Sequence, residues 1–460
     1  MEEIKPKQMN GLPSGWSPAS WRKKNAIQQV VYADEEHLTG VLNQLKQQPA
    51  LVTSWEIEAL RNRLAEAAAG RRFLLQGGDC AERFEDCRVE LIKNRLKILL
   101  QMSVILIYGL QMPVLRIGRF AGQYAKPRSD SHETRDGVSL PSYRGDNINA
   151  PAFTTEARMP DPQRLMQAYY HSAVQLNLVR ALADAGFADL HNAKNWNLSF
   201  AQEEPYIQSY QTIISKIRRA LNFAKTVSDH PISGLGRVTF YTSHEALHLP
   251  YEEALTREVA HANGVYNLST HLPWIGKRTL FEDSAHVEYM RGIRNPVGIK
   301  VSHEMVPSDL IPLVRFLNPT NAPGRLTIIT RMGAAKVGDA LPRLIEAVQR
   351  AGLNVLWCCD PMHGNTETAT NGIKTRKFEN ILAELEAVID MHTRMKTILG
   401  GVHFELTGED VTECVGGASG VEEEDLNQRY HSTVDPRLNV SQSLEMALRI
   451  AEKYQNMESA

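Results

Sequence analysis

The stretch from Val297 to Cys359 decides the fold class, because short apolar runs alternate in it with helical patterns. It reads VGIKV at 297–301, LTIIT at 326–330 and VLWCC at 355–359, with the helical stretches SDLIPLVRFL at 308–317 and ALPRLIEAVQR at 340–350 between them. Strands this apolar have no face for water, which is typical of a parallel sheet covered by helices. The stretch therefore predicts consecutive strand–helix units.

The same unit recurs along most of the chain. We count eight apolar runs, at Phe73–Gly77, Val114–Gly118, Val238–Thr242, Val265–Ile275, Val297–Val301, Leu326–Thr330, Val355–Cys359 and Val402–Leu406. Helical patterns follow most of them, at Tyr251–Ala262, Ser308–Leu317, Ala340–Arg350, Phe378–Met395 and Ser441–Tyr454. Eight such strands separated by helices predict an α/β protein with a (β/α)8 TIM barrel.

Two segments lie outside the regular repeat. Residues 1–70 precede the first strand and are expected to form an N-terminal extension, with a helix near Ser54–Ala69. Residues 71–460 are expected to form the catalytic barrel, interrupted after the second strand by an insertion at about 124–236. The helical patterns Gln163–Ala185 and Tyr206–Thr226 predict that this insertion is helical.

Composition excludes several classes of protein. Fifty-one Lys and Arg against 53 Asp and Glu give a net charge of -2, which provides no overall field for nucleic acid or an anionic membrane. The apolar segment Ile98–Leu115 resembles a membrane span, but Gln101, Gln111 and Pro113 interrupt it, so we expect a buried helix leading into a strand. Five cysteines without a C-x-x-C pair, and an N-terminus without signal-peptide features, predict a cytoplasmic protein.

Polar side chains follow the apolar runs, where a (β/α)8 barrel carries its active site. One set offers a thiolate, an imidazole and two carboxylates: Cys80, His363, Glu405 and Asp435. The thiolate disfavours Mg and Ca, and two carboxylates are too many for a structural zinc site, so the set favours a divalent metal such as Mn, Co, Fe or Zn. Taken singly, each residue more often has a structural role: Cys80 as a buried thiol, His363 as a turn residue, and Glu405 and Asp435 as a rim carboxylate and a helix cap.

A second set consists of cations. Its members are Arg119, Lys126, Arg128, Arg278, Lys300 and Arg331. An isolated Arg or Lys at a strand end is more often part of a surface ion pair, but six that converge on one face match two phosphorylated substrates and a carboxylate. The partners predicted from this set are therefore small phosphorylated molecules.

The motifs around these residues resemble the type II 3-deoxy-D-arabino-heptulosonate 7-phosphate (DAHP) synthases from about Arg71 to Tyr454. They are LQGGDCAE at 75–82, Arg119 with AGQYAKPRS at 121–129, SYRGD at 142–146, SHEAL at 243–247, WIG at 274–276, RMG at 331–333, CDPMHGN at 359–365, TGE at 407–409, TEC at 412–414 and DPRLN at 435–439. The resemblance implies a metal-dependent transferase with a (β/α)8 barrel. It would condense phosphoenolpyruvate with D-erythrose 4-phosphate and water to DAHP and phosphate, the first step of the shikimate pathway to chorismate and the aromatic amino acids.

The resemblance also implies roles for individual residues. The metal, most simply Mn2+, would be held by Cys80, His363, Glu405 and Asp435. Phosphoenolpyruvate would be bound by Arg119, Lys277, Arg278, Lys300 and Arg331, and the phosphate of erythrose 4-phosphate by Arg128 and Ser129. Lys126 would lie between the reacting carbons, and either Lys126 or His363 would donate a proton to the new hydroxyl group.

The chain departs from the family pattern at two places. The pattern Trp-Ile-Gly-Glu-Arg reads Trp-Ile-Gly-Lys277-Arg278 here, and the usual glycine-containing turn after Lys300 reads Val301-Ser302-His303-Glu304. The resemblance further implies a homo-oligomer (dimer or tetramer), allosteric regulation and a possible chorismate mutase partner. Three alternatives stay open: a sister synthase that uses an imino sugar phosphate (aminoDAHP-type), a catalytically inactive regulatory barrel, and a metal-dependent aldolase unrelated to phosphoenolpyruvate.

Overall fold

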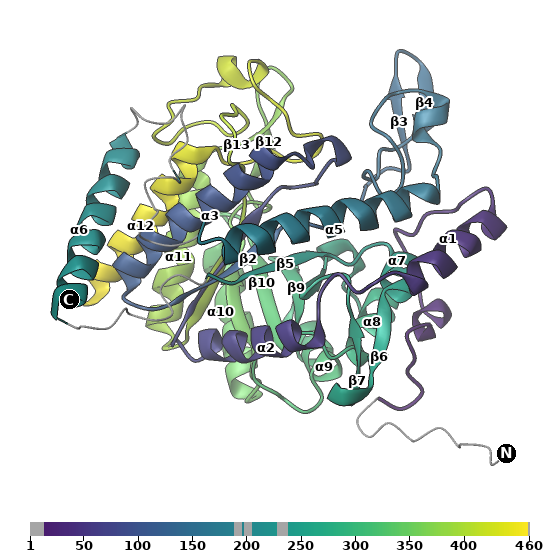
Figure 1. Ribbon diagram of the computed structural model, residues 1–460, viewed down its shortest axis with the longest axis horizontal. Coiled ribbons are helices and arrows are strands. Elements are labelled where there is room, and N and C mark those ends of the chain that lie inside the picture. The colour runs from purple at the N-terminus through teal and green to yellow at the C-terminus, as the bar shows by residue number, and fades with distance from the viewer. Residues whose placement is uncertain (1–12, 188–195, 197–204, 228–237, 459–460) are drawn as a thin grey trace.

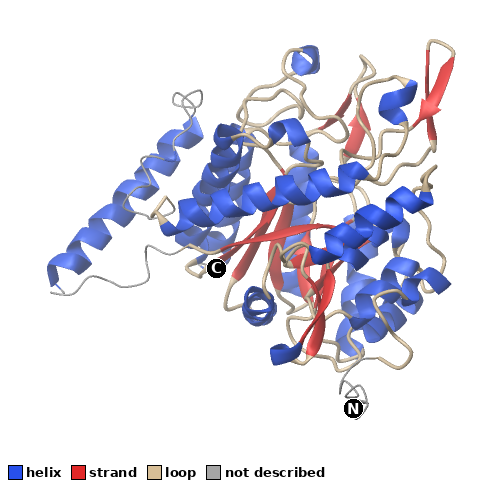
Figure 2. Cartoon of the chain, turned by 45° about the vertical axis from the view of Figure 1, so that its right-hand side comes forward, coloured by secondary structure: helices blue, strands red, loops and turns tan. Residues whose placement is uncertain are grey.

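The computed structural model describes residues 13–187, 196, 205–227 and 238–458. Within these residues, eight parallel strands close a barrel in the order β1, β14, β11, β10, β9, β8, β5 and β2, and helices surround it (Figures 1 and 2). The barrel strands are β1 (Phe73–Gly78), β2 (Val114–Arg119), β5 (Phe240–Glu245), β8 (Leu272–Ile275), β9 (Val297–Ser302), β10 (Leu326–Arg331), β11 (Leu356–Cys359) and β14 (Leu399–Glu405). The predicted (β/α)8 barrel is confirmed.

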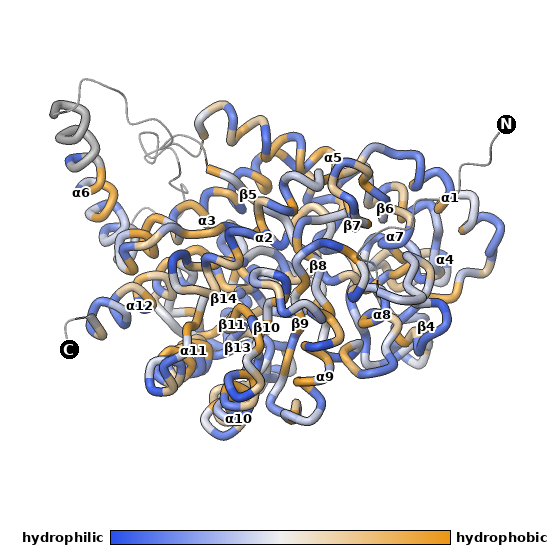
Figure 3. The backbone as a smooth tube through the Cα atoms, turned by 90° about the horizontal axis from the view of Figure 1, so that it is seen from below, coloured by the Kyte–Doolittle hydropathy of each residue, from blue (hydrophilic) through white to orange (hydrophobic). Residues whose placement is uncertain are grey.

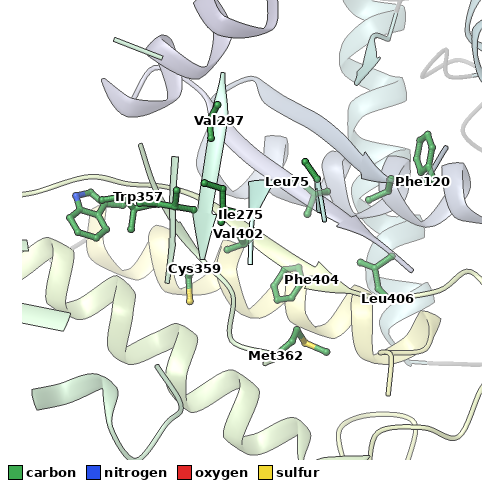
Figure 4. Packing of buried hydrophobic residues seen from close by; sticks show 14 of the residues in the cluster. Leu75, Phe120, Ile275, Val297, Trp357, Cys359, Met362, Val402, Phe404 and Leu406 are labelled. Atoms are coloured by element: carbon green, nitrogen blue, oxygen red, sulfur yellow. The ribbon is translucent and has the colours of Figure 1, made fainter. Parts of the chain in front are cut away.

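The strands are apolar because both of their faces are covered. Leu74, Leu115 and Trp274 point into the barrel, where they form one cluster with Leu60 and Leu64 of helix α2 (Ser54–Ala68). Helix α2 therefore closes the end of the barrel at which the strands begin. Alternate strand residues belong to the larger cluster between strands and outer helices, and Figure 4 shows some of them: Leu75, Val402 and Phe404.

The outer helices follow from amphipathic patterns in the sequence. Along them, hydrophobic and hydrophilic residues alternate (Figure 3), and the apolar positions are buried against the strands. The helices that follow barrel strands include α9 (Pro307–Leu317), α10 (Val337–Arg350), α11 (Phe378–Arg394) and α12 (Val440–Glu458). Each begins or ends within a few residues of its expected bounds.

Helix α3 (Val89–Leu110) contains the apolar segment that resembles a membrane span. It packs along α12, and Gly109 permits the close approach, since a Cβ at this position would lie 2.2 Å from Cβ of Ala451. The helix ends at Gln111, which has a left-handed φ of 53°. The expectation of a buried helix leading into a strand is confirmed. Among the described residues, no helix is both long and apolar enough to cross a membrane.

Two expectations for the region after the third strand are wrong. The helix expected over Tyr251–Ala262 is only α7 (Leu249–Ala254), and the chain continues into a hairpin of β6 (Thr256–Val259) and β7 (Gly264–Asn267). The apolar run Val265–Ile275 is accordingly two strands, of which only β8 belongs to the barrel. The β-branched residues of 256–259 favour a strand over a helix, and the polar residues 268–271 separate β7 from β8.

The insertion after β2 contains the two expected long helices, α5 (Gln163–Asp184) and α6 (Pro205–Val227). It also contains a hairpin of β3 (His132–Arg135) and β4 (Val138–Pro141) and the short helix α4 (Thr155–Arg158), which the sequence did not lead us to expect. Helix α5 packs against α3 and against α1 (Glu35–Gln47) of the N-terminal extension (Figure 1). The extension and the insertion therefore contact each other outside the barrel.

Buried histidines make the stability of this fold dependent on pH. Burial lowers the pKa of His248, His286 and His392 to about 4. The unfolded chain takes up protons near pH 6.5 and the folded chain only near pH 4, so this stability is fully present above pH 6.5 and is lost as the pH falls toward 4. By pH 5 each histidine costs about 2 kcal/mol. We predict that Tm of the EDTA-treated protein, measured by calorimetry, falls by at least about 5 °C between pH 7 and pH 5.

The variant His392→Gln is the control for this prediction, since it removes one of three similar groups. It should reduce the fall in Tm by about one third. A Tm that stays the same between pH 7 and pH 5 would contradict the expected protonation state of all three side chains.

Candidate active site

A polar cavity opens at the end of the barrel where the strands finish. Its volume is ≈ 270 Å³. Ten of the predicted site residues line it: Arg119, Lys126, Arg128, Ser129, Lys277, Arg278, Lys300, Arg331, His363 and Asp435. The other two, Cys80 and Glu405, are fully buried next to it. The structure thus brings together all twelve residues that the sequence analysis selected.

The topology explains this convergence. Arg119, Arg331 and Glu405 are the last residues of β2, β10 and β14, and Lys300 lies within β9. The remaining residues belong to loops that leave the same end of the barrel, among them the short helix η6 (Lys277–Thr279) after β8. Parallel strands end on one side, so residues far apart in sequence meet there.

Three of the four predicted metal ligands form one group. Ligand atoms of Cys80, Glu405 and Asp435 all lie within 4.8 Å of one another, and Cys80 Sγ is 3.4 Å from Asp435 Oδ2. His363 lies beside this group, with Nε2 3.0 Å from Glu405 Oε1 and Nδ1 2.7 Å from Asp360 Oδ2. A carboxylate that orients the second ring nitrogen is typical of a metal-binding histidine. The donor set therefore fits a divalent metal.

The protonation states of the donors agree with this interpretation. Burial, and then the neighbouring Glu405 carboxylate, raise the pKa of the Cys80 thiol, so the thiol is protonated until a cation binds. Burial alone would raise the pKa of the Glu405 carboxyl, but His363, Arg119 and Arg376 together hold it well below its usual range. The carboxylate is thus ready to bind a metal, whereas the thiol must first lose a proton.

A buried ion network joins the segments that carry two of the ligands. Arg437 is 5% exposed and donates to Asp79 Oδ1 at 2.7 Å and to both oxygens of Glu413, at 2.8 and 3.0 Å. Asp79 precedes Cys80, and Arg437 comes two residues after Asp435. The network therefore fixes Cys80 relative to Asp435. The motifs around these residues pointed to the region, but sequence reasoning did not single out Arg437 or Glu413.

The deep cations of the cavity are fixed by carboxylates and main-chain oxygens. Arg119 donates to the carbonyl oxygens of Asp79 and Cys80, at 3.0 and 3.1 Å, and to Glu405 at 2.8 Å. Lys300 Nζ lies 2.9 Å from Asp360 Oδ2. These contacts orient both charges before any substrate enters.

Three further cationic side chains of the cavity have different partners. Arg331 donates to the carbonyl oxygen of His363 at 2.6 Å, and so links two loops of the site. At the rim, Arg278 donates to Ser129 Oγ at 3.0 Å, and Arg128 pairs with Glu133 at 3.0 Å. The rim cations lie on the loop after β2 and on η6, so they can approach a second anionic group from another side.

Lys126 lies between the metal ligands and the rim. Its side chain is 6% exposed, and Nζ is 3.8 Å from Glu405 Oε1. Burial alone would lower the pKa of this amine, but the neighbouring Cys80, Glu405 and Asp435 raise it. Lys126 is therefore a charged ammonium group that can donate a proton inside the cavity.

Lys277 differs from the other cations. Its Nζ forms an ion pair with Glu304 Oε2 at 2.5 Å, and both side chains are partly exposed to solvent. The two places at which the chain departs from the family pattern thus contact each other. Lys277 lines the cavity, but the charge of its side chain is balanced by Glu304.

Sequence reasoning missed three residues of the site. Lys374 and Arg376 lie on β13 (Lys374–Arg376), which pairs with β12 (Thr366–Thr368) in a hairpin after β11. Lys374 Nζ contacts Asp435 Oδ1 at 2.5 Å, and Arg376 contacts Glu405 Oε2 at 2.8 Å. Neither residue lies at the end of a barrel strand, so the pattern that found the other site residues did not select them. Glu245 also lines the cavity, and its position at the end of the third strand was a signal that could have found it.

Comparisons with known proteins agree with the geometry. A family model described as the Class-II DAHP synthetase family matches residues 16–451. A protein of Streptomyces coelicolor named phospho-2-dehydro-3-deoxyheptonate aldolase is 47% identical over 448 residues, which cover 97% of this chain and 99% of that protein. A protein of the same name from Neurospora crassa is 45% identical over 456 residues, covering 96% and 94%.

A solved structure is similar in fold. It is that of phospho-2-dehydro-3-deoxyheptonate aldolase from Francisella tularensis, with a TM-score of 0.51 and 15% sequence identity. The match covers 94% of this chain and 99% of that one. At this level of identity the similarity supports the barrel alone.

The protonated Cys80 thiol predicts that metal binding releases a proton. Isothermal titration of the metal-free protein with Mn2+, in two buffers of different ionisation enthalpy, should show release of about one proton per metal bound. The affinity should rise with pH between 6.5 and 8, because fewer protons then compete for the thiolate.

Two cysteine variants control this experiment. Cys80→Ser should lose most of the affinity, whereas Cys87→Ser, which changes a partly buried thiol outside the cavity, should bind Mn2+ like the wild type. A binding heat independent of buffer, with the same affinity at both pH values, would contradict the assignment of Cys80.

Proposed function

The chain belongs to the class-II DAHP synthetase family, and we propose that it carries out the family's reaction in the cavity at the end of the barrel. It condenses phosphoenolpyruvate with D-erythrose 4-phosphate and water, and it releases DAHP and inorganic phosphate. This is the first step of the shikimate pathway to chorismate and the aromatic amino acids. The observation that carries the assignment is the meeting of a metal-ligand group with eight lysine and arginine residues in one cavity.

We propose that Cys80, His363, Glu405 and Asp435 hold the metal, with Mn2+ the first choice and Co2+, Fe2+ or Zn2+ as alternatives. The mixed sulfur, nitrogen and oxygen donors and the group within 4.8 Å support this assignment. When bound, the metal supplies Lewis-acid polarisation of the aldehyde oxygen of erythrose 4-phosphate.

Phosphoenolpyruvate is proposed to bind to the deep cations Arg119 and Lys300, to Arg331, and to Arg278 at the rim. This substrate carries a phosphate and a carboxylate, and Arg119, Lys300, Arg331 and Arg278 can pair with both groups. Because carboxylates and main-chain oxygens already orient Arg119 and Lys300, little reorganisation is needed when the substrate enters. The contribution of Lys277 is proposed to come from its main chain, since its side chain pairs with Glu304.

The rim residues Arg128 and Ser129 are proposed to bind the phosphate of erythrose 4-phosphate. This places the aldehyde over the enol carbon C3 of phosphoenolpyruvate, which attacks it. Water then adds at C2, and phosphate leaves while the surrounding cations stabilise its charge. Lys126 fits best as the proton donor to the new hydroxyl group, because both ring nitrogens of His363 already face carboxylates.

The organisation of the chain and its environment are part of the same proposal. We propose an N-terminal extension over residues 1–70, a catalytic barrel over 71–460 and a regulatory and assembly role for the insertion at about 124–236. Exposed Tyr170 and Val174 on one face of α5 support subunit contacts there. We also propose a homo-oligomer (dimer or tetramer), a chorismate mutase partner, allosteric control and a cytoplasmic location, which the resemblance to the family supports. The relatives named phospho-2-dehydro-3-deoxyheptonate aldolase do not favour the imino sugar alternative or the inactive alternative.

The reaction can be tested by following the absorbance of phosphoenolpyruvate. Consumption should require erythrose 4-phosphate, stop after treatment with EDTA, and return when Mn2+, Co2+ or Zn2+ is added. The imino sugar phosphate serves as the alternative substrate in a parallel reaction. If no phosphoenolpyruvate is consumed under any of these conditions, the proposed function is wrong.

Two neighbouring cations should respond differently to substitution. Arg278→Ala removes a charge that faces the cavity. It should raise KM for phosphoenolpyruvate by about 10- to 100-fold, as expected for the loss of a charge-assisted hydrogen bond. Lys277→Ala removes a side chain that is turned to Glu304 and should change each KM less than about threefold. Steady-state kinetics with each substrate varied in turn checks both values. Equal effects of the two substitutions would show that the Lys277 side chain also binds substrate.

A further inference from the structure

One buried carboxylate outside the cavity bonds to two loops that carry site residues. Glu384 lies on α11 and is fully buried. Its Oε1 accepts a hydrogen bond from the main-chain N–H of Met332 at 2.7 Å, and its Oε2 accepts one from Asn365 Nδ2 at 2.7 Å. Met332 follows Arg331, and Asn365 comes two residues after His363. Glu384 therefore links the loop after β10 to the loop after β11.

Asn365 completes this link from within the second loop. Its Oδ1 accepts a hydrogen bond from the main-chain N–H of Ala334 at 2.9 Å, and its Nδ2 also donates to the carbonyl oxygen of Pro361 at 2.8 Å. Glu384 and Asn365 thus act as one unit, which we call the loop brace. Every hydrogen-bonding atom of the two side chains has a partner within the loops or in the brace itself.

The two loops touch through their backbones beside the brace. Gly333 has a left-handed φ of +87°, and a Cβ at Gly364 would lie 2.3 Å from the main-chain nitrogen of Gly333. No side chain fits between the loops at this point. A small change in the brace would therefore shift one backbone against the other, and with it Arg331 relative to His363.

We propose that Glu384 is a positioning residue that sets the separation of Arg331 and His363. This inference rests on the proposed function, in which Arg331 binds phosphoenolpyruvate and His363 binds the metal. The brace touches neither substrate nor metal. It fixes the positions of Arg331 and His363 relative to each other, and a displacement of about 1 Å in a substrate-binding or metal-binding group lowers the rate of catalysis strongly.

Stability alone does not explain a carboxyl group at this position. Glu384 lies among Ile381, Leu385 and Val388 on the buried face of α11, and burial raises the pKa of its carboxyl group to about 7. Burying a charged group costs folding free energy, and an apolar side chain of similar size is often more stabilising there. The hydrogen bonds to the two loops therefore indicate that the carboxylate has a role in the site.

The test is a double-mutant cycle with Glu384→Gln and Asn365→Ala. Glutamine has the same size, but its side-chain NH2 group replaces one carboxylate oxygen. This group is a donor and cannot accept the hydrogen bond from Asn365 Nδ2. Glu384→Gln should raise both KM for phosphoenolpyruvate and Kd for Mn2+, measured by titration of the metal-free protein, about tenfold. KM for erythrose 4-phosphate should stay within about twofold, because Arg128 and Ser129 lie on another loop. Asn365→Ala should change the two KM values and Kd for Mn2+ in the same way. In the double variant these constants should change no more than in the more strongly affected single variant.

Glu445→Gln is the matched control. Glu445 is also a buried helical carboxylate that accepts a main-chain hydrogen bond, from Ala418 at 2.6 Å, but it holds a loop that does not line the cavity. It should leave all three constants unchanged, whatever its effect on Tm.

Several results would overturn the proposal. They are an unchanged Kd for Mn2+ in Glu384→Gln, an equal rise in KM for both substrates, and additive effects in the double variant. If Glu384→Gln does not fold, Asn365→Ala decides, and wild-type constants in that variant reject the brace. If the wild type consumes no phosphoenolpyruvate, the proposed function fails, whereas the comparison of Mn2+ affinities still tests the brace on its own.

Discussion

The site depends on one buried charge, the carboxylate of Glu405 at the end of β14. It is fully buried, and it is surrounded by Arg119 at 2.8 Å, Arg376 at 2.8 Å, His363 at 3.0 Å and Lys126 at 3.8 Å. An unpaired carboxylate at this depth would cost several kcal/mol, so its partners must be held in place. They come from β2, from the loop after it, from the hairpin β12–β13 and from the loop after β11. Pairing this one charge therefore organises most of the mouth of the barrel.

The same arrangement explains how a nearly neutral protein can bind anions. The chain carries a net charge of -2, yet eight lysine and arginine residues line one small cavity. The deep ones are fixed by Glu405, Asp360 and main-chain oxygens, which removes the need to reorganise them when a phosphate arrives. Carboxylates next to the cations also balance the positive charge of the cavity. Binding of anions and of a divalent cation in the same place then follows from one mixed network.

The sequence was sufficient for the barrel and for the residues at strand ends. Strands such as β10 are buried on both faces, which leaves an unmistakable apolar run, and their last residues meet because all barrel strands point the same way. The prediction was wrong in 251–262, where the β-branched residues of 256–259 interrupt a helical pattern with a strand, and it was incomplete where site residues lie off the barrel strands. Arg376 sits in a hairpin with no periodic signal. Glu384 could have been found from the sequence, because it is a carboxylate among the apolar residues on one face of a helix.

The two departures from the family pattern are best understood as one. The resemblance leads us to expect an acidic residue at position 277, and a lysine there adds a cation to the lining of the cavity, but Glu304 of the neighbouring loop pairs with it at 2.5 Å. An exposed pair of this kind contributes at most about 1 kcal/mol to stability, so its effect is on charge and orientation. The pair balances the charge of the lysine ammonium group at the edge of the cavity before an anion enters. Glu304 thus compensates for the positive charge of Lys277. Binding of anions in the cavity then depends on Arg278 and on the cations that lie deeper.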